Sequence, residues 1–181
     1  ALQSRGRLAE ARAILQALLL RAPKVAQIHF QLGQIAAAEQ QTDQAATHYQ
    51  NAAALAPAEP AIPRAEVLLH SAAGNEDAAL AAHDRLIALA PEQVKPRADK
   101  ALYLQQIGRF DAARAEFRRA LKRAPWDGEL YRLMVGGEKI APNAPVIAEM
   151  QKALRHPRCT GRARIHMNFA LAKAMDDAGR H

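Results

Sequence analysis

The chain consists of amphipathic helical segments separated by short polar turns. Between residues 26 and 38, small and apolar residues recur at i, i+3, i+4 and i+7, which is the spacing of one helix face. A polar turn follows at residues 40–43, and residues 45–55 then carry a second face with helical spacing. The first face consists of His29, Leu32, Gly33 and Ala36, and the second of Ala45, Tyr49 and Ala52. This pattern predicts two helices joined by a tight turn, which is an αα-hairpin.

Prolines punctuate the chain at a constant interval of 34 residues, each directly after an alanine. They are Pro23, Pro57, Pro91 and Pro125. Proline ends a helix because it lacks the amide donor and clashes with the preceding turn. A fixed period of this size indicates stacked copies of one supersecondary unit, since a single hairpin cannot bury its apolar face alone. The sequence therefore predicts an all-α solenoid of about ten helices.

The residue order within this unit resembles the tetratricopeptide repeat. The copy that carries it best has Leu32-Gly33 in its first helix, then Ala45, Tyr49, Ala52 and the closing Pro57. The copy from Val94 matches in its second helix, at Gly108, Ala113, Phe117, Ala120 and Pro125. The copy from Pro60 departs, with Glu66-Val67 in place of Leu-Gly and His83 in place of the aromatic residue. The resemblance implies a right-handed superhelical solenoid of helix-turn-helix repeats that binds proteins or peptides.

The pattern changes near residue 127. Residues 1–127 are expected to hold a partial first repeat and three further repeats, and residues 128–181 a degenerate repeat and the start of a truncated one. Glycines and prolines predict an irregular segment at residues 136–145, followed by helices at residues 146–154 and 162–178. Both ends cut through a repeat, so we expect terminal helices with exposed apolar faces. Such faces predict a homo-oligomer, or contact with a C-terminal domain of the same parent chain.

Composition narrows the classes of protein further. Of 181 residues, 50% are hydrophobic but only 4% aromatic, which suits closely approaching helices. No apolar run approaches the roughly 18 residues that a membrane span requires, so no membrane partner is expected. Cys159 is the only cysteine and cannot form an internal disulfide or a cysteine metal cage. A reducing cytoplasm is the expected location.

Catalytic motifs are absent from the sequence. It has no glycine-rich phosphate loop, no His-Glu-x-x-His, no Gly-x-Ser-x-Gly and no paired cysteines. His29, His70 and His83 fall on predicted core faces, where a packed imidazole is expected rather than a ligand. We therefore expect no enzyme activity in this chain, and no catalytic, cofactor-binding or metal-binding residue.

The first helix of each repeat is expected to line the concave side of the stack. The spacing places on this face Gln27, Phe30, Gln34, Arg64, Leu68, Lys95, Leu102, Gln105 and Arg132. Apolar groups interrupted by basic ones suit a protein or peptide partner with acidic residues. The alternative is that the apolar groups pack on the next helix. Some tetratricopeptide domains clamp a C-terminal carboxylate with Lys and Asn, but Phe30 and Gln34 stand at those places.

Basic residues are in excess, with a net charge of +7, and are densest between residues 155 and 166. The segment holds Arg155, His156, Arg158, Arg162, Arg164 and His166. It could meet an acidic segment or a sulfated or phosphorylated ligand; the alternative is a solvated loop. Basic neighbours could lower the pKa of Cys159, although an inert thiol is expected. Nucleic-acid binding ranks last, because basic and aromatic residues do not interleave.

The end of the chain resembles the junction at which tetratricopeptide repeats precede a sulfotransferase domain in bacterial proteins. The matching segments are Pro145–Met150, Arg164–Ala174 and Asp176–Arg180. This resemblance implies an accessory scaffold beside a sulfotransferase that uses a phosphoadenosine sulfate donor. The phosphate-binding loop of that domain is absent, so no catalytic residue is carried over. A stand-alone peptide-binding adaptor and a basic nucleic-acid binder remain as alternatives.

Overall fold

The computed structural model describes residues 2–179, with side chains from Arg7 onward, and this part of the chain is all helical. Its ten helices and absence of strands confirm the predicted fold class. The helices are α1 (Leu2–Arg21), α2 (Ala26–Ala38), α3 (Thr42–Leu55), α4 (Ala61–Ala72), α5 (Glu76–Leu89), α6 (Lys95–Gln106), α7 (Phe110–Leu121), α8 (Gly128–Gly136), α9 (Pro145–Ala153) and α10 (Gly161–Asp177). None of these helices is long and apolar enough to cross a membrane.

The chain divides into two compact units, which we call unit 1 and unit 2. Unit 1 ends at Leu89 and unit 2 begins at Ala90. The sequence pattern instead places a change at residue 127, inside unit 2. Helices α1, α3, α5 and α7 each end shortly before one of the four regularly spaced prolines. The proline interval therefore marks helix ends, as the sequence predicts.

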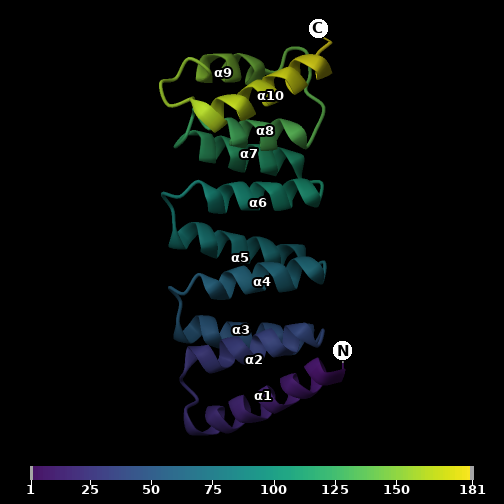
Figure 1. Ribbon diagram of the computed structural model, residues 1–181, viewed down its shortest axis with the longest axis vertical. Coiled ribbons are helices and arrows are strands. Elements are labelled where there is room, and N and C mark those ends of the chain that lie inside the picture. Colours follow the sequence, from purple (N-terminus) through teal and green to yellow (C-terminus); the bar gives the residue numbers. More distant parts are fainter. Residues whose placement is uncertain (1, 180–181) are drawn as a thin grey trace. The chain divides into compact units, whose positions relative to one another are not determined.

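Unit 1 is a succession of helical hairpins in which each helix packs on the next (Figure 1). Helix α2 pairs with α3 and α4 with α5, while α1 lies against α2 and α3 against α4. The core between the two hairpins consists of Ala36, Ala45, Tyr49, Ala52 and Ile62. Three of these five are alanines, whose small side chains permit neighbouring helices to approach closely. Tyr49 is 3% exposed and fills the remaining space.

Unit 2 begins with a regular hairpin, α6 with α7, and α8 packs on α7. Its core is more varied than that of unit 1, with Phe117, Met150 and Met167 fully buried. Cys159 and Val135 are buried in the same cluster. Methionine suits this region because its unbranched side chain fills irregular gaps. The irregular segment between α8 and α9 falls where the glycines and prolines predict it.

Helices α8 and α10 lie side by side and run parallel, and Figure 1 shows α10 next to both α8 and α9. Gly128, at the start of α8, faces the backbone of Ala163 and Met167 in the first half of α10. Just beyond the end of α8, the amide of Ile140 donates to Asp177 at the end of α10, at 2.9 Å. The main neighbour of α8 is therefore α10, and α9 also packs on α10.

Two buried glutamates connect the helices within hairpins. In unit 1, Glu66 of α4 is 3% exposed and pairs with Arg85 of α5 at 2.5 Å. In unit 2, Glu116 of α7 lies 3.4 Å from Arg97 and 4.0 Å from Lys100, both on α6. Buried carboxylates need such partners because desolvation of an unpaired charge is costly. Glu66 stands where the repeat pattern expects an apolar residue, so this ion pair explains the departure.

Candidate functional site

The predicted groove residues of unit 1 lie on α2 and α4. Gln27, Gln34, Arg64 and Leu68 are exposed, and Leu68 is 73% exposed. Phe30 is half-buried, and its ring lies 5.8 Å from that of Tyr49. Phe30 thus packs partly on the core, whereas Leu68 presents an apolar side chain to solvent.

A cavity of about 500 Å³ lies between α2, α3 and α4. It brings together two of the predicted groove residues, Gln34 and Leu68. Its walls also include Ala37, Gln40, Thr42, Tyr49, Ala65, Leu69, Ala72 and Ala73. Gln40 has φ of 61°, a left-handed conformation that is uncommon for a residue with a side chain. The cavity therefore combines an apolar floor with amide and hydroxyl groups at its edge.

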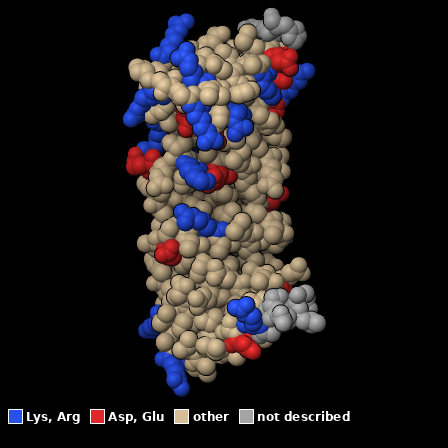
Figure 2. Space-filling model, viewed as in Figure 1, with Lys and Arg blue, Asp and Glu red and all other residues tan. Residues whose placement is uncertain are grey.

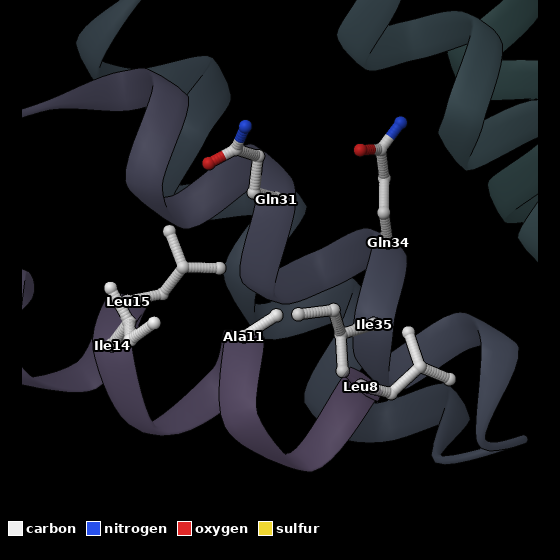
Figure 3. A pocket seen from close by; sticks show the side chains of 7 residues that line it. All are labelled: Leu8, Ala11, Ile14, Leu15, Gln31, Gln34 and Ile35. Carbon is white, nitrogen blue, oxygen red and sulfur yellow. The ribbon is translucent and has the colours of Figure 1, made fainter. Parts of the chain in front are cut away.

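A second cavity of about 490 Å³ lies between α1 and α2. Its lining residues are Leu8, Ala11, Ile14, Leu15, Gln31, Gln34 and Ile35. Figure 3 shows the Gln31 and Gln34 side chains extending in the same direction from α2, beside the apolar side chains of α1 and Ile35. Gln34 lines both cavities, so the exposed face of α2 carries an amide between two apolar hollows.

The predicted groove residues of unit 2 are less uniform. Lys95 is exposed and pairs with Asp99 at 2.7 Å, and Leu102 is exposed on the same helix. Arg132 of α8 is exposed and lies 3.7 Å from Glu129. The Gln105 side chain donates to the carbonyl oxygens of Leu133 and Met134, at 3.2 and 3.3 Å.

Gln105 therefore connects α6 to α8 through hydrogen bonds. The helical spacing that places Gln105 among the predicted groove residues does not indicate this connection. A single groove that includes the predicted residues of both units stays a prediction.

A pair of histidines lies between α2 and α3. The Nδ1 atoms of His29 and His48 are 3.3 Å apart. Burial lowers the pKa of His48, and the nearby His29 and Arg12 lower it further. No group of three or more metal-ligating side chains occurs among the described residues. The two rings are in contact between the helices of one hairpin, and His29 is buried, as the sequence predicts for that residue.

Cys159 is buried in unit 2, and burial raises the pKa of its thiol while Arg164 acts in the opposite direction. The thiolate is the reactive form of cysteine, and a raised pKa reduces the fraction of thiolate. The environment of Cys159 therefore does not support the alternative of a thiol activated by basic neighbours. Exposed apolar side chains occur on both terminal helices that the sequence singles out. They are Ile14, Leu18 and Leu20 on α1 and Ile165 and Phe169 on α10. Self-association through these helices stays a prediction.

Comparison with family models assigns the repeats. A tetratricopeptide repeat model matches residues 26–59, which are the α2–α3 hairpin. A second tetratricopeptide repeat model matches residues 68–155. The chain is a tetratricopeptide repeat protein. The matches do not test the association with a sulfotransferase, which stays a prediction.

Solved structures similar to this tetratricopeptide repeat protein share its fold at low sequence identity. A crystal structure of MamA protein is 14% identical, with a TM-score of 0.58, and the match covers 97% of this chain and 85% of that one. The structure of YrrB, described as a tetratricopeptide repeat protein with an unusual peptide-binding site, is 15% identical, with a TM-score of 0.55. That match covers 99% of this chain and 82% of the other. A search of curated proteins finds no match.

Several residues that line the cavities of this tetratricopeptide repeat protein are not among the predicted groove residues. Gln31 follows Gln27 at i+4, so helical spacing could have added it to the same face. Gln40 belongs to the turn after α2, and only its backbone conformation directs attention to it. Ile165 of α10 lines neither cavity, and its exposure depends on how α10 packs on α8, which the sequence does not show.

Proposed function

We propose that this chain is a protein-interaction scaffold that binds a peptide segment on the α2–α4 face of unit 1. The observation that carries the proposal is the cavity beside Leu68, because a large exposed apolar side chain at the edge of a hollow favours ligand contact. The family assignment supports a binding function, and YrrB is described as having a peptide-binding site.

The groups around this cavity suit different parts of a peptide. An apolar ligand side chain would contact Leu68, Leu69 and Tyr49. The amides of Gln34 and Gln40 can donate and accept, so they suit main-chain N–H and C=O groups. Arg64 is exposed one turn before Leu68 and is without a carboxylate partner among the described residues. It would attract an acidic residue of the ligand.

Selection from a displayed library of random short peptides tests this proposal. Peptides enriched on the 181-residue chain are then measured against Leu68→Asp and against Leu20→Asp as the matched control. Leu20 is 88% exposed on α1 and lines neither cavity. We expect Leu68→Asp to weaken binding about tenfold, as for a buried interface contact, and Leu20→Asp to leave it unchanged. Equal affinity of the two variants would reject this site.

Two narrower functions follow from the sequence. An accessory domain of a sulfotransferase is supported only by the resemblance of residues 145–180, whereas the stand-alone adaptor needs no further domain. Reading the parent gene beyond residue 181 separates them, because the first requires a phosphate-binding loop for the sulfate donor. We also propose a cytoplasmic location, which rests on the single cysteine.

A further inference from the structure

Arginines in unit 2 fall into two groups. One group, on α6, α7, α8 and the turn after α7, pairs with carboxylates: Arg97, Arg114, Arg118, Arg119, Arg123 and Arg132. By contrast, Arg155, Arg158, Arg162 and Arg164 are exposed, and the structure pairs none of them with a carboxylate among the described residues. We call these four the basic surface. No acidic residue occurs in the sequence between Glu149 and Asp176. The Glu129 carboxylate of α8 lies 4.0 Å from His166 of α10, and its arginine contact is with Arg132.

Aromatic contacts hold part of the basic surface in place. The guanidinium of Arg158 lies 4.5 Å from the centre of the Trp126 ring, which is cation–π distance. The His156 ring stacks on Trp126 with 4.9 Å between centroids, and His156 Nδ1 accepts from the amide of Arg158 at 3.1 Å. Trp126 itself packs on the core of unit 2. The Arg158 side chain is therefore ordered before any ligand arrives, which lowers the entropic cost of binding.

The basic surface continues into an exposed apolar stripe on α10. Arg162, Ile165 and Phe169 follow each other at i, i+3 and i+7, so they share one helix face. Ile165 is 55% and Phe169 66% exposed. The first turn of α10 contains no acidic residue, and its free amides add to the positive potential beside Arg162. Figure 2 shows Lys and Arg side chains gathered over the region of α8, α9 and α10.

We propose that the basic surface and the Ile165–Phe169 stripe together bind an acidic protein segment in which acidic residues are followed by apolar ones. Unpaired arginine forks match carboxylates in geometry and charge. An aliphatic side chain such as Ile165 offers nothing to a nucleic-acid backbone, whereas it contacts a Leu or Phe of a peptide. A protein segment with acidic and apolar residues uses both parts of this surface, whereas a free anion uses only the first.

This surface lies in unit 2 and is independent of the cavity in unit 1. The test uses the same displayed peptide library with the 181-residue chain and two charge-reversal variants. Arg155→Glu with Arg162→Glu changes the basic surface and spares the Arg158–Trp126 contact. Lys24→Glu with Lys122→Glu is the control, because these exposed lysines undergo the same change of charge elsewhere. Circular dichroism checks that both variants keep their helical content.

We expect acidic peptides with apolar residues among those enriched, and we expect their affinity to fall about tenfold in the Arg155/Arg162 variant but not in the control. Phe169→Ser should weaken the same peptides, which separates this surface from simple charge attraction. An equally large loss of peptide affinity in the Lys24/Lys122 control variant would overturn the proposal. So would tighter retention of a random RNA pool than of any peptide at physiological salt. Peptides that respond only to Leu68→Asp would reject this surface while supporting the site in unit 1.

Discussion

The Tyr49 ring lies directly against the α-carbon of Gly33. A Cβ placed on Gly33 would come within 2.5 Å of Tyr49 Cε1 and 2.6 Å of Cδ1. Both residues belong to the α2–α3 hairpin and are buried. The absence of a side chain at residue 33 is therefore what allows an aromatic ring between these two helices.

Gly33→Ala should destabilise unit 1 by about 1–2 kcal/mol. Overpacking a core costs about 1–3 kcal/mol, and alanine recovers up to about 1 kcal/mol of helix propensity. The free energy of unfolding in urea, followed by circular dichroism, measures the change. Gly136→Ala is the matched control, because nothing lies within 4 Å of a Cβ there. The control should be neutral or slightly stabilising, and an equal loss in both variants would contradict the packing argument.

Glu116→Gln should destabilise unit 2 by about 2–3 kcal/mol. The side chain is buried, and its removal as an anion takes away the carboxylate that faces the half-buried Arg97. Glu92→Gln provides the comparison, since Glu92 pairs with Arg123 but is 79% exposed. An exposed ion pair contributes up to about 1 kcal/mol, so this variant should change stability little. Similar values for the two variants would show that burial of Glu116 does not matter.

Unit 1 should become less stable in mild acid because of His48. Burial, together with His29 and Arg12, holds the pKa of His48 below its ordinary value. As the pH falls through about 6.5, the unfolded chain takes up the proton before the folded chain does. The free energy of unfolding therefore decreases in that direction.

Urea unfolding at a series of pH values tests this effect, with His48→Gln as the variant that cannot titrate. The variant should show a shallower decline of stability with acid than the original chain. Parallel curves for the two proteins would assign the decline to other groups. His156→Gln serves as a control in unit 2, where the imidazole stacks on Trp126.

Gln105→Ala should destabilise unit 2 by about 1 kcal/mol, because its amide donates to two carbonyl oxygens of α8. The neighbouring Gln106 is exposed, so Gln106→Ala should have no comparable effect. Differential scanning calorimetry compares the two. If Gln106→Ala costs as much as Gln105→Ala, the hydrogen bonds to α8 are not the source of the stability.

Much of the hairpin architecture could be predicted from the sequence because its causes are local. Proline geometry determines where α1, α3, α5 and α7 end, and helical spacing identifies which face of α2 is buried. The pairing of α8 with α10 could not be predicted in the same way. It depends on contact between Gly128 and residues near Met167, across a segment in which the regular interval is lost.

In the candidate sites too, some features could be predicted from the sequence and others could not. Spacing places Gln34 and Leu68 on one face, and the structure shows a cavity between them. Spacing also places Gln105 among the predicted groove residues. In the structure, however, its long amide side chain turns toward α8 and donates to the carbonyl oxygen of Leu133. The density of arginines between residues 155 and 164 is visible in the sequence, whereas their lack of carboxylate partners depends on the folded arrangement.

The parallel arrangement of α8 and α10 restricts how the length of this region can vary. Two parallel neighbours require a connection that travels back along a full helix, and α9 with its flanking turns provides that return path. Deletions within α9 would remove buried side chains such as Val146, Ile147 and Met150 from the core of unit 2. Extra residues in the exposed turn at residues 141–143 would lengthen the path without disturbing the contacts at its ends. Homologous chains should therefore gain residues here more readily than they lose them.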